Sequence, residues 1–164
     1  MADKDAFIAV YDTQADALFR FALFGVGDRE LAKDLVSETF AKVWEYITKG
    51  NKTENMKALC YRTLRNLIVD HYRKHKSGSL DGLLEAGFDP IGEDGMDRVE
   101  NEEDKAMLRK AIATLPAAIR EVVVLRYIEE YSPKEISELL HISQSLVSVR
   151  LFRATALLKK TLCT

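Results

Sequence analysis

The segment from Tyr131 to Lys160, YSPKEISELLHISQSLVSVRLFRATALLKK, predicts two helices joined by a tight turn. Ser132 and Glu135 have the spacing of a capping box, and Pro133 occupies the first helical position, so a helix should begin here. Ser143 can cap the following helix. Apolar residues recur at helical spacing in that second helix and predict a single buried stripe. This stripe consists of Val147, Leu151, Ala154 and Leu158.

The opposite face of the second helix is polar. It carries Gln144, Ser145, Ser148, Arg150 and Arg153. A short capped helix, followed by a helix with small polar residues at its start and arginines behind them, is typical of helix-turn-helix DNA recognition. An ordinary helical hairpin is the alternative that this segment alone leaves open.

The charge distribution supports contact with nucleic acid, although the total does not. The net charge of −2 argues against a nucleic-acid binder. However, residues 57–76 carry 6 basic and 1 acidic side chains, and residues 105–164 carry 10 and 5. The intervening residues 77–104 carry 1 basic and 10 acidic side chains. Because salt screens charge over about 8–10 Å, these local charges matter more than the sum.

Composition excludes several classes of protein. No apolar run approaches the ~20 residues of a membrane span, so we expect no membrane insertion. The first residues have no signal-peptide pattern, and Cys60 and Cys163 lack metal-type spacing, which indicates a reducing, cytoplasmic setting. The sequence contains no nucleotide-binding loop, catalytic triad or metal motif, so we expect neither a cofactor nor enzymatic activity.

The periodicity predicts an all-α chain of two small helical domains joined by an acidic flexible linker. The domains cover residues 1–76 and 101–164, and the linker covers 77–100, where glycines and acids break the helical period. The helices expected before the helix-turn-helix span about 5–25, 28–49, 53–76, 101–114 and 116–130.

Two helices of the first domain carry candidate functional faces. In the second helix, Asp34, Ser37 and Glu38 point outward and form either a solvated acidic surface or a docking face for a partner helix. In the third, basic residues can neutralise phosphates, tyrosines can stack on unpaired bases, and Asn66 can bond a base edge. The basic and aromatic residues are Arg62, Arg65, Arg73, Lys74, Tyr61 and Tyr72. The alternative is that the tyrosines are core and the basic run is a solvated helix end.

Four stretches together carry a resemblance to a known family. They are DLVSETFAKVW, YRTLRNLIVDHYRKH, an acidic linker and LPAAIREVVVLRYIEEYSPKEISELLHISQSLVSVRLFRA. In this order the chain resembles a bacterial RNA polymerase sigma factor of the sigma-70 family, of the short extracytoplasmic-function (ECF) type. The resemblance implies a three-helix region 2 domain and a helix-turn-helix region 4 domain.

The resemblance also implies partners and site residues. RNA polymerase core would be bound through its β′ clamp helices by Asp34, Ser37, Glu38, Phe40 and Trp44, and through its β flap by region 4. The −10 promoter strand would be captured by Tyr61, Arg62, Arg65, Asn66, Asp70, Arg73 and Lys74. The −35 DNA would be bound by Arg126, Lys134, Gln144, Ser145, Ser148, Val149, Arg150 and Arg153. An anti-sigma factor is a further implied partner, which could hold the chain near the membrane. When bound to polymerase, the chain would be associated with the nucleoid.

Three positions depart from the family pattern. Ser37 stands where glutamine is usual, which weakens one expected polymerase contact. His141 stands where the turn usually has glycine, although histidine tolerates a positive φ better than most residues. The Ser148-Val149 pair removes a lysine and adds a valine that could contact a thymine methyl group, so either the −35 preference differs from that of common relatives or the affinity for DNA is weak.

Three alternatives for the linker and two for the function stay open. The linker is a tether, an RNA mimic in the polymerase exit path or, through its apolar residues, an aid to a closed, inhibited form. The alternatives to a sigma factor are a stand-alone helix-turn-helix regulator and a degenerate sigma factor that sequesters a partner.

Overall fold

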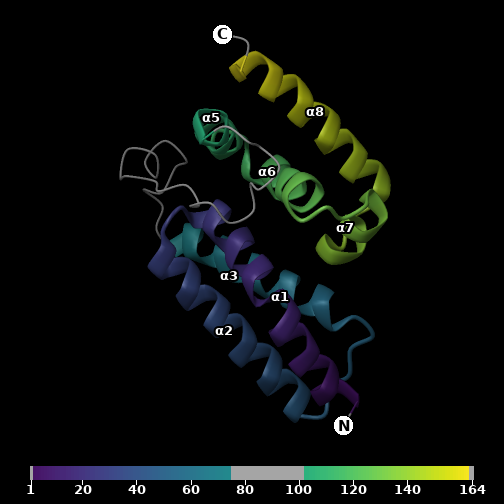
Figure 1. Cartoon of the computed structure of the whole chain (residues 1–164). Helices are drawn as coiled ribbons and strands as arrows, with labels where there is room; N and C mark the ends of the chain where they lie inside the picture. Colours follow the sequence, from purple (N-terminus) through teal and green to yellow (C-terminus); the bar gives the residue numbers. More distant parts are fainter. Residues whose placement is uncertain (1, 75–101, 163–164) are drawn as a thin grey trace.

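The computed structural model of the chain describes residues 2–74 and 102–162. Throughout these residues the regular structure is helical, with no strand in either described range, which confirms the all-α prediction (Figure 1). The predicted acidic linker, residues 77–100, lies outside the described residues.

Three helices form the first domain: α1 (Ala2–Val26), α2 (Arg29–Thr48) and α3 (Met56–Lys74). Each packs on the other two. At the turn from α1 to α2, Gly27 has a φ of 70°, and the Asp28 carboxylate caps α2 by accepting a bond from the Leu31 amide at 3.1 Å. The prediction that the third helix begins at 53 is wrong by three residues, since Asn55 accepts a bond from the Ala58 amide and caps the helix there.

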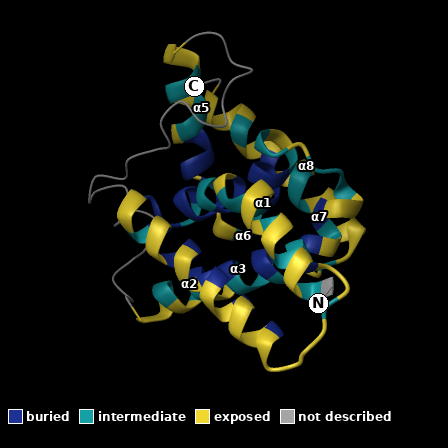
Figure 2. Ribbon diagram, turned by 60° about the horizontal axis from the view of Figure 1, so that its bottom comes forward, coloured by how far each residue is buried: buried dark blue, intermediate teal, exposed yellow. Residues whose placement is uncertain are grey.

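The core of this domain lies where the three helices face one another, as the buried positions in Figure 2 show. Leu18 of α1, Val43 of α2 and Leu64 of α3 are among its fully buried side chains. Burying each such side chain contributes about 1.5–3 kcal/mol. The acidic face of α2 and the basic face of α3 lie outside this core.

The second domain contains α5 (Glu102–Ala113), α6 (Ala117–Val123), α7 (Pro133–Leu140) and α8 (Gln144–Leu162). The prediction of one helix over 116–130 is wrong, because α6 gives way to a π-helix, η1 (Val124–Ile128). A π-turn inserts an extra residue and rotates the residues that follow it relative to a regular helix. The segment ends at Glu130, whose φ of 66° turns the chain toward α7.

The helix-turn-helix has the predicted local structure. Ser132 accepts a bond from the Glu135 amide at 3.1 Å, and the Glu135 carboxylate accepts one from the Ser132 amide at 3.2 Å. His141 adopts the left-handed conformation with a φ of 58° and ends α7. The Ser143 hydroxyl accepts a bond from the Leu146 amide. Val147 and Ala154 of the predicted stripe of α8 are buried, whereas Leu151 and Leu158 are only half-buried.

The two domains pack directly against each other. Helix α3 lies against α7, and α1 lies against α6 and η1 (Figure 1). The predicted DNA-binding helix of the first domain therefore forms part of the contact with the second domain.

Candidate polymerase and DNA interfaces

The outer face of α2 presents the predicted acidic surface to solvent. Asp34, Ser37 and Glu38 are exposed, while Leu35 and Val36 between them are buried. The helical period thus places the three polar side chains on one outward face. Such a face is available to a partner helix without rearrangement of the core.

The two aromatic residues of the predicted docking set differ in position. Trp44 is partly exposed, with its ring centroid 5.1 Å from that of Phe7. Phe40 is buried, with its ring 5.9 Å from Phe7 and 4.9 Å from Tyr11. The prediction that Phe40 belongs to a contact surface is wrong for this structure, because its side chain holds α1 against α2.

Helix α3 presents a polar face along most of its length. Asn66, Asp70, Arg73 and Lys74 are exposed, and Arg62 is half-buried, with its Nε donating to the Ala58 carbonyl at 3.3 Å. Arg62 and Asn66 also line a groove between the loop before α3 and α7. Lys52 extends the groove on one side, and Glu138 and His141 of α7 close it on the other.

Tyr61 does not present a ring face for base stacking, and that prediction is wrong in this structure. Its side chain is 0% exposed. The ring meets Phe21 edge-on at 5.5 Å and Tyr131 edge-on at 6.3 Å. Burial, with a smaller effect of Tyr131, raises the pKa of Tyr61 well above its usual range. The second tyrosine, Tyr72, is half-buried and donates to the Gly25 carbonyl.

Arg65 is also occupied. Its Nε lies 2.9 Å and 3.0 Å from the two carboxylate oxygens of Glu121 in α6. The predicted −10 set is therefore divided in the structure. Asn66, Asp70, Arg73 and Lys74 are open to solvent, whereas Tyr61 and Arg65 take part in the packing between domains.

Helix α8 presents the predicted recognition face. Gln144, Ser145, Ser148, Val149 and Arg153 are all exposed. Because the side chains at the start of a recognition helix are those that reach base edges, this face has the required placement. A further apolar residue on α8, Phe152, is 78% exposed and was not in the predicted set.

The remaining members of the −35 set differ in access. Lys134 is exposed at the start of α7, as a phosphate contact requires. Arg126 is half-buried and its Nη1 donates to the Tyr131 carbonyl at 3.2 Å, so it shapes the turn before α7. Arg150 is half-buried, and its Nη1 is buried without a hydrogen-bond partner among the described residues.

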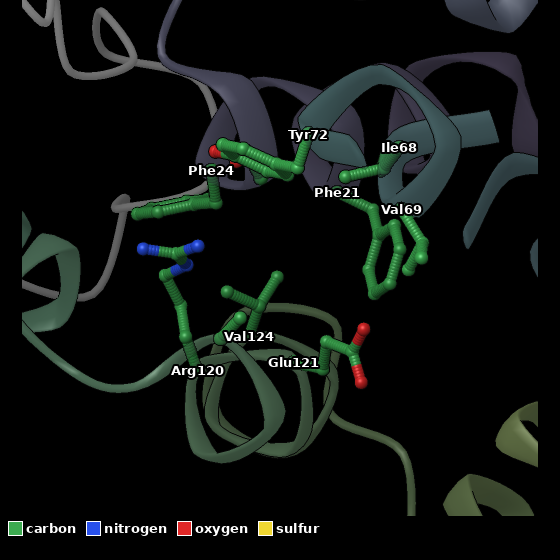
Figure 3. Close-up of a pocket in the computed structure, with 10 residues that line it drawn as sticks. Phe21, Phe24, Ile68, Val69, Tyr72, Arg120, Glu121 and Val124 are labelled. Carbon is green, nitrogen blue, oxygen red and sulfur yellow. The ribbon is translucent and has the colours of Figure 1, made fainter. Parts of the chain in front are cut away.

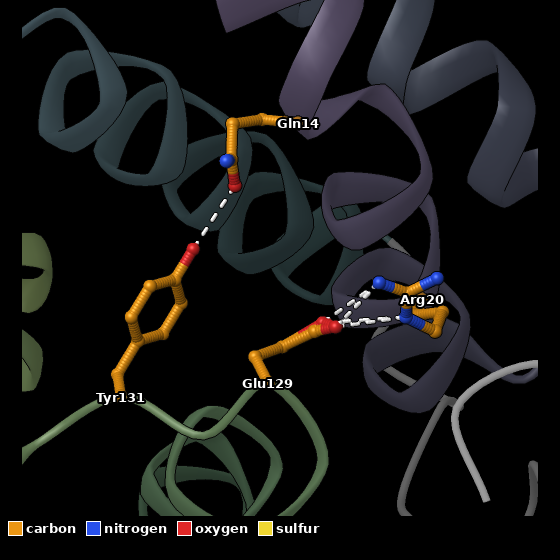
Figure 4. Close-up of polar contacts among 4 residues, drawn as sticks. All are labelled: Gln14, Arg20, Glu129 and Tyr131. Atoms are coloured by element: carbon orange, nitrogen blue, oxygen red, sulfur yellow. Dashed lines mark hydrogen bonds and ion pairs between the residues drawn. The ribbon is translucent and has the colours of Figure 1, made fainter. Parts of the chain in front are cut away.

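Sequence reasoning missed the residues that join the two domains, shown in Figure 4. Arg20 of α1 and Glu129, directly after η1, form an ion pair with a closest distance of 2.6 Å. The Tyr131 hydroxyl donates to Gln14 Oε1 at 3.0 Å, and Lys57 Nζ lies 4.6 Å from the Tyr131 ring centroid. Burial acts to lower the pKa of Arg20, but the hydrogen bond to Glu129 and the charge of Glu129 outweigh this effect and raise the pKa.

A small cavity lies between the domains beside these contacts (Figure 3). Phe21, Phe24 and Tyr72 line it from the first domain, and Arg120 and Glu121 line it from α6. Burial lowers the pKa of Arg120. Burial also raises the pKa of Glu121, against the opposing effect of Arg65, Arg150 and Arg120. Ionisation of the Glu121 carboxylate therefore carries a desolvation cost at this position.

The described residues contain no group of His, Cys, Asp and Glu side chains that could hold a metal ion. Within the same two ranges, no helix has both the length and the apolar character needed to cross a membrane.

Comparison with protein families covers both domains. Residues 10–78 match the family described as Sigma-70 region 2, and residues 105–158 match the family described as Sigma-70, region 4. The first match contains the acidic face of α2 and the polar face of α3. The second contains the helix-turn-helix.

Similar proteins extend the match to the whole chain. The ECF RNA polymerase sigma factor SigW of Bacillus subtilis is 30% identical over 169 residues, which cover 98% of this chain and 90% of SigW. The ECF RNA polymerase sigma factor SigL of Mycobacterium tuberculosis is 30% identical over 155 residues, which cover 94% of this chain and 87% of SigL.

Solved structures share the fold at lower identity. The sigma factor RpoE of Bartonella quintana, in complex with the anti-sigma factor NepR, has a TM-score of 0.72 at 21% identity and covers 97% of this chain and 98% of its own. CnrH, in complex with the cytosolic domain of CnrY, has a TM-score of 0.67 at 23% identity and covers 97% of this chain and 88% of its own. With both regions matched in order and relatives aligned over almost the full length, the chain belongs to the ECF group of the sigma-70 family of RNA polymerase sigma factors.

Proposed function

We propose that this chain is a dissociable, non-catalytic subunit that gives RNA polymerase its choice of promoter. The observation that carries the proposal is the presence, in one chain, of a sigma region 2 domain and a capped helix-turn-helix with an exposed polar face. Two DNA contacts at separate promoter elements need two such surfaces on one protein. The free energy of these contacts would open the duplex without covalent chemistry.

The first domain would bind core polymerase through the outer face of α2. Asp34 and Glu38 supply negative charge for a basic or polar partner helix, and Trp44 adds a partly exposed ring. Ser37 offers a hydroxyl in the same surface. The β′ clamp helices are the partner that membership of the family suggests for this face.

The −10 strand would lie along α3 and the loop before it. Asn66 can bond a base edge, and Arg62, Arg73 and Lys74 can neutralise phosphates. Arg62 and Asn66 line one groove together with Lys52, which places a base-edge partner beside two phosphate partners. Asp70 lies on the same exposed face and would limit which bases approach.

The −35 duplex would be bound by α8 in the major groove. Gln144, Ser145 and Ser148 can bond base edges, and the exposed Val149 can contact a thymine methyl group. Lys134 would hold a phosphate and fix the position of the helix on the duplex. Because valine replaces a polar side chain in this surface, a preference for thymine at one position is expected.

The docking face of α2 can be tested by charge reversal. The variant with Asp34→Arg and Glu38→Arg should lose co-elution with purified core polymerase, while its helix content and melting temperature stay at wild-type values because both side chains are exposed. Asp104→Arg on α5, also exposed, is the control for charge reversal at a position outside the proposed face. Wild-type core affinity in the double variant would contradict the assignment of this face.

An anti-sigma factor is the regulatory partner that the proposal includes. Two solved structures that share the fold are each complexes with another protein, and in one of them that protein is named as an anti-sigma factor. We further propose that the chain acts in the cytoplasm, at the nucleoid when polymerase is bound and near the membrane if its anti-sigma factor is anchored there. Co-purification of tagged chain from cells, followed by mass spectrometry, should recover polymerase subunits and one such partner.

A further inference from the structure

Arg120 of α6 is a buried charge without a carboxylate of its own. It is 4% exposed, and arginine is almost never buried to this extent unless it is paired. Within the described residues, the half-buried Arg20 and Arg65 each have a carboxylate partner, whereas Arg120 Nη1 donates to the Ala113 carbonyl at 3.3 Å. The Tyr72 hydroxyl lies near enough to accept a second bond. Because a guanidinium group has five N–H donors, most of its bonding capacity is left for another group.

The neighbouring carboxylate, that of Glu121, is shared among three arginines. Its charge acts on Arg120, but both of its oxygens are bonded to Arg65. It also acts on Arg150 of α8, whose Nη1 is buried without a hydrogen-bond partner among the described residues. One carboxylate is therefore set against three guanidinium groups. Since an uncompensated charge in a desolvated site is costly, this surplus of positive charge favours the binding of an anion.

The cavity between the domains gives such an anion space beside Arg120 (Figure 3). Its volume is about 50 Å³, and one water needs about 10–15 Å³, so the cavity can take a group of about three to five heavy atoms. Figure 3 shows the Arg120 guanidinium directed toward Phe24 and Tyr72, while the Glu121 carboxylate lies at the other end of the lining, beyond Val124. The cationic end of the cavity is thus separate from the carboxylate that Arg65 holds.

Most of the remaining wall is apolar. It consists of Phe21 and Phe24 of α1, Ile68 and Val69 of α3, and Val124 of η1. Arginine binds a carboxylate through two parallel hydrogen bonds, and a short alkyl group suits a hydrocarbon wall. A small carboxylic acid therefore matches both ends of the cavity, whereas a fully hydrated inorganic anion matches only one.

We propose that this cavity is a binding site for a short-chain monocarboxylate, about the size of acetate or propionate, with its carboxylate on Arg120 and its alkyl end against Phe21 and Phe24. Both domains line the cavity, so the ligand should raise the stability of the packed chain as a whole. This site does not depend on the proposed role of the chain in transcription.

Two measurements on the full chain detect such a ligand. The first is thermal unfolding followed by circular dichroism at constant sodium concentration, with gluconate replaced stepwise by acetate or propionate. Gluconate is too large for the cavity and serves as the background anion. The second is saturation-transfer NMR, in which irradiation of aromatic protons reaches the propionate methyl group if that group contacts phenylalanine. Chloride at the same concentrations shows the effect of a small anion without an alkyl group.

The size of the ligand limits the expected affinity. A ligand of about four or five heavy atoms binds no more tightly than tens of micromolar, so we expect a dissociation constant on the order of 1 mM. At about fifty times that concentration, the melting temperature should rise by about 5 °C or more. Chloride should raise it less, and the propionate methyl group should show saturation transfer.

Three variants locate the site. Arg120→Met removes the charge but keeps a long side chain, so it should weaken propionate binding by about tenfold or more while the chain stays folded. Arg109→Met is the matched control, because Arg109 is also half-buried but lies on α5 and does not line the cavity. Ala117→Leu keeps Arg120 and narrows the cavity from α6, so it should also weaken binding. This third variant keeps the test decisive if Arg120→Met does not fold.

Loss of the carboxylate-dependent shift and of saturation transfer in Arg120→Met and Ala117→Leu, with both retained in Arg109→Met, would support the site. If wild type shows no such shift, or Arg120→Met and Ala117→Leu shift as much as wild type, the site does not exist. An equal shift with chloride would overturn the assignment to carboxylates. None of these results touches the proposed function, which fails only if wild-type chain does not direct initiation by core polymerase.

Discussion

Tyr61 gives the sharpest test of how this fold limits its own DNA-binding surface. The ring is fully buried between Phe21 of α1 and Tyr131 of the second domain, so Tyr61→Ala should leave a large cavity. Truncations of buried aromatic residues cost about 3–5 kcal/mol. For a chain of this size, such a loss lowers the melting temperature by about 10 °C.

The hydroxyl of Tyr61 gives the matched control. It is buried, and although the Tyr131 hydroxyl is near enough to affect its pKa, it has no hydrogen bond of good geometry to any described residue. Removing a buried polar group that is not bonded is close to neutral or stabilising. The free energy of unfolding of Tyr61→Phe should therefore lie within about 0.5 kcal/mol of the wild-type value or exceed it.

Urea denaturation followed by circular dichroism measures both variants. The packing account predicts a large loss for Tyr61→Ala and almost none for Tyr61→Phe. If Tyr61→Ala unfolds like wild type but loses binding to single-stranded DNA, the ring is a stacking platform and its burial here does not describe the chain in solution.

Three further predictions concern single side chains. Ser132→Ala removes the capping-box acceptor of α7 and should cost about 1 kcal/mol in urea denaturation, whereas Ser132→Asp should retain most of the stability. Burial raises the pKa of Cys60 to about 12, so little of its thiol is ionised at pH 8. In a Cys163→Ser background, iodoacetamide should therefore alkylate Cys60 roughly a thousandfold more slowly than an exposed thiol. The two rates should become equal only when urea unfolds the chain. Burial raises the folded-state pKa of Glu121, so the stability that its protonated carboxyl contributes is present at low pH and is lost as the pH rises above the ordinary pKa of 4.5. The free energy of unfolding of Glu121→Gln, relative to that of wild type, should therefore increase with pH. A difference between the two proteins that does not change with pH would contradict the assigned burial.

Local chemistry explains what the sequence could predict. The Ser132 capping box, the Asp28 cap and the left-handed His141 each depend on residues within four positions of one another. The buried stripe of α8 depends only on the helical period, and Val147 and Ala154 are indeed buried. These features need no knowledge of which helices pack together.

Contacts between distant segments explain what it could not. Tyr61 and Arg65 have the composition of a nucleic-acid surface, and only the packing of α3 against the second domain reveals that one is buried and the other paired. Arg20 and Glu129 are separated by 109 positions, and no periodicity relates them. Arg20 in the mainly acidic first helix, and the Glu129-Glu130 pair before the helix-turn-helix, are weak signals that gain meaning only from the fold.

The account also explains why a chain of net charge −2 can be a DNA-binding protein. Its basic residues gather on α3 and α8, and Glu121 pairs with Arg65 of α3. Binding to DNA should depend strongly on salt, because each phosphate contact releases counterions.

Transcription by purified core polymerase on fragments of genomic DNA tests the central claim most directly. Addition of the wild-type chain should create discrete transcription start sites that core alone does not use, and addition of the Asp34→Arg, Glu38→Arg variant should not. An unchanged pattern of starts with wild-type chain, at concentrations that saturate core, would contradict the account.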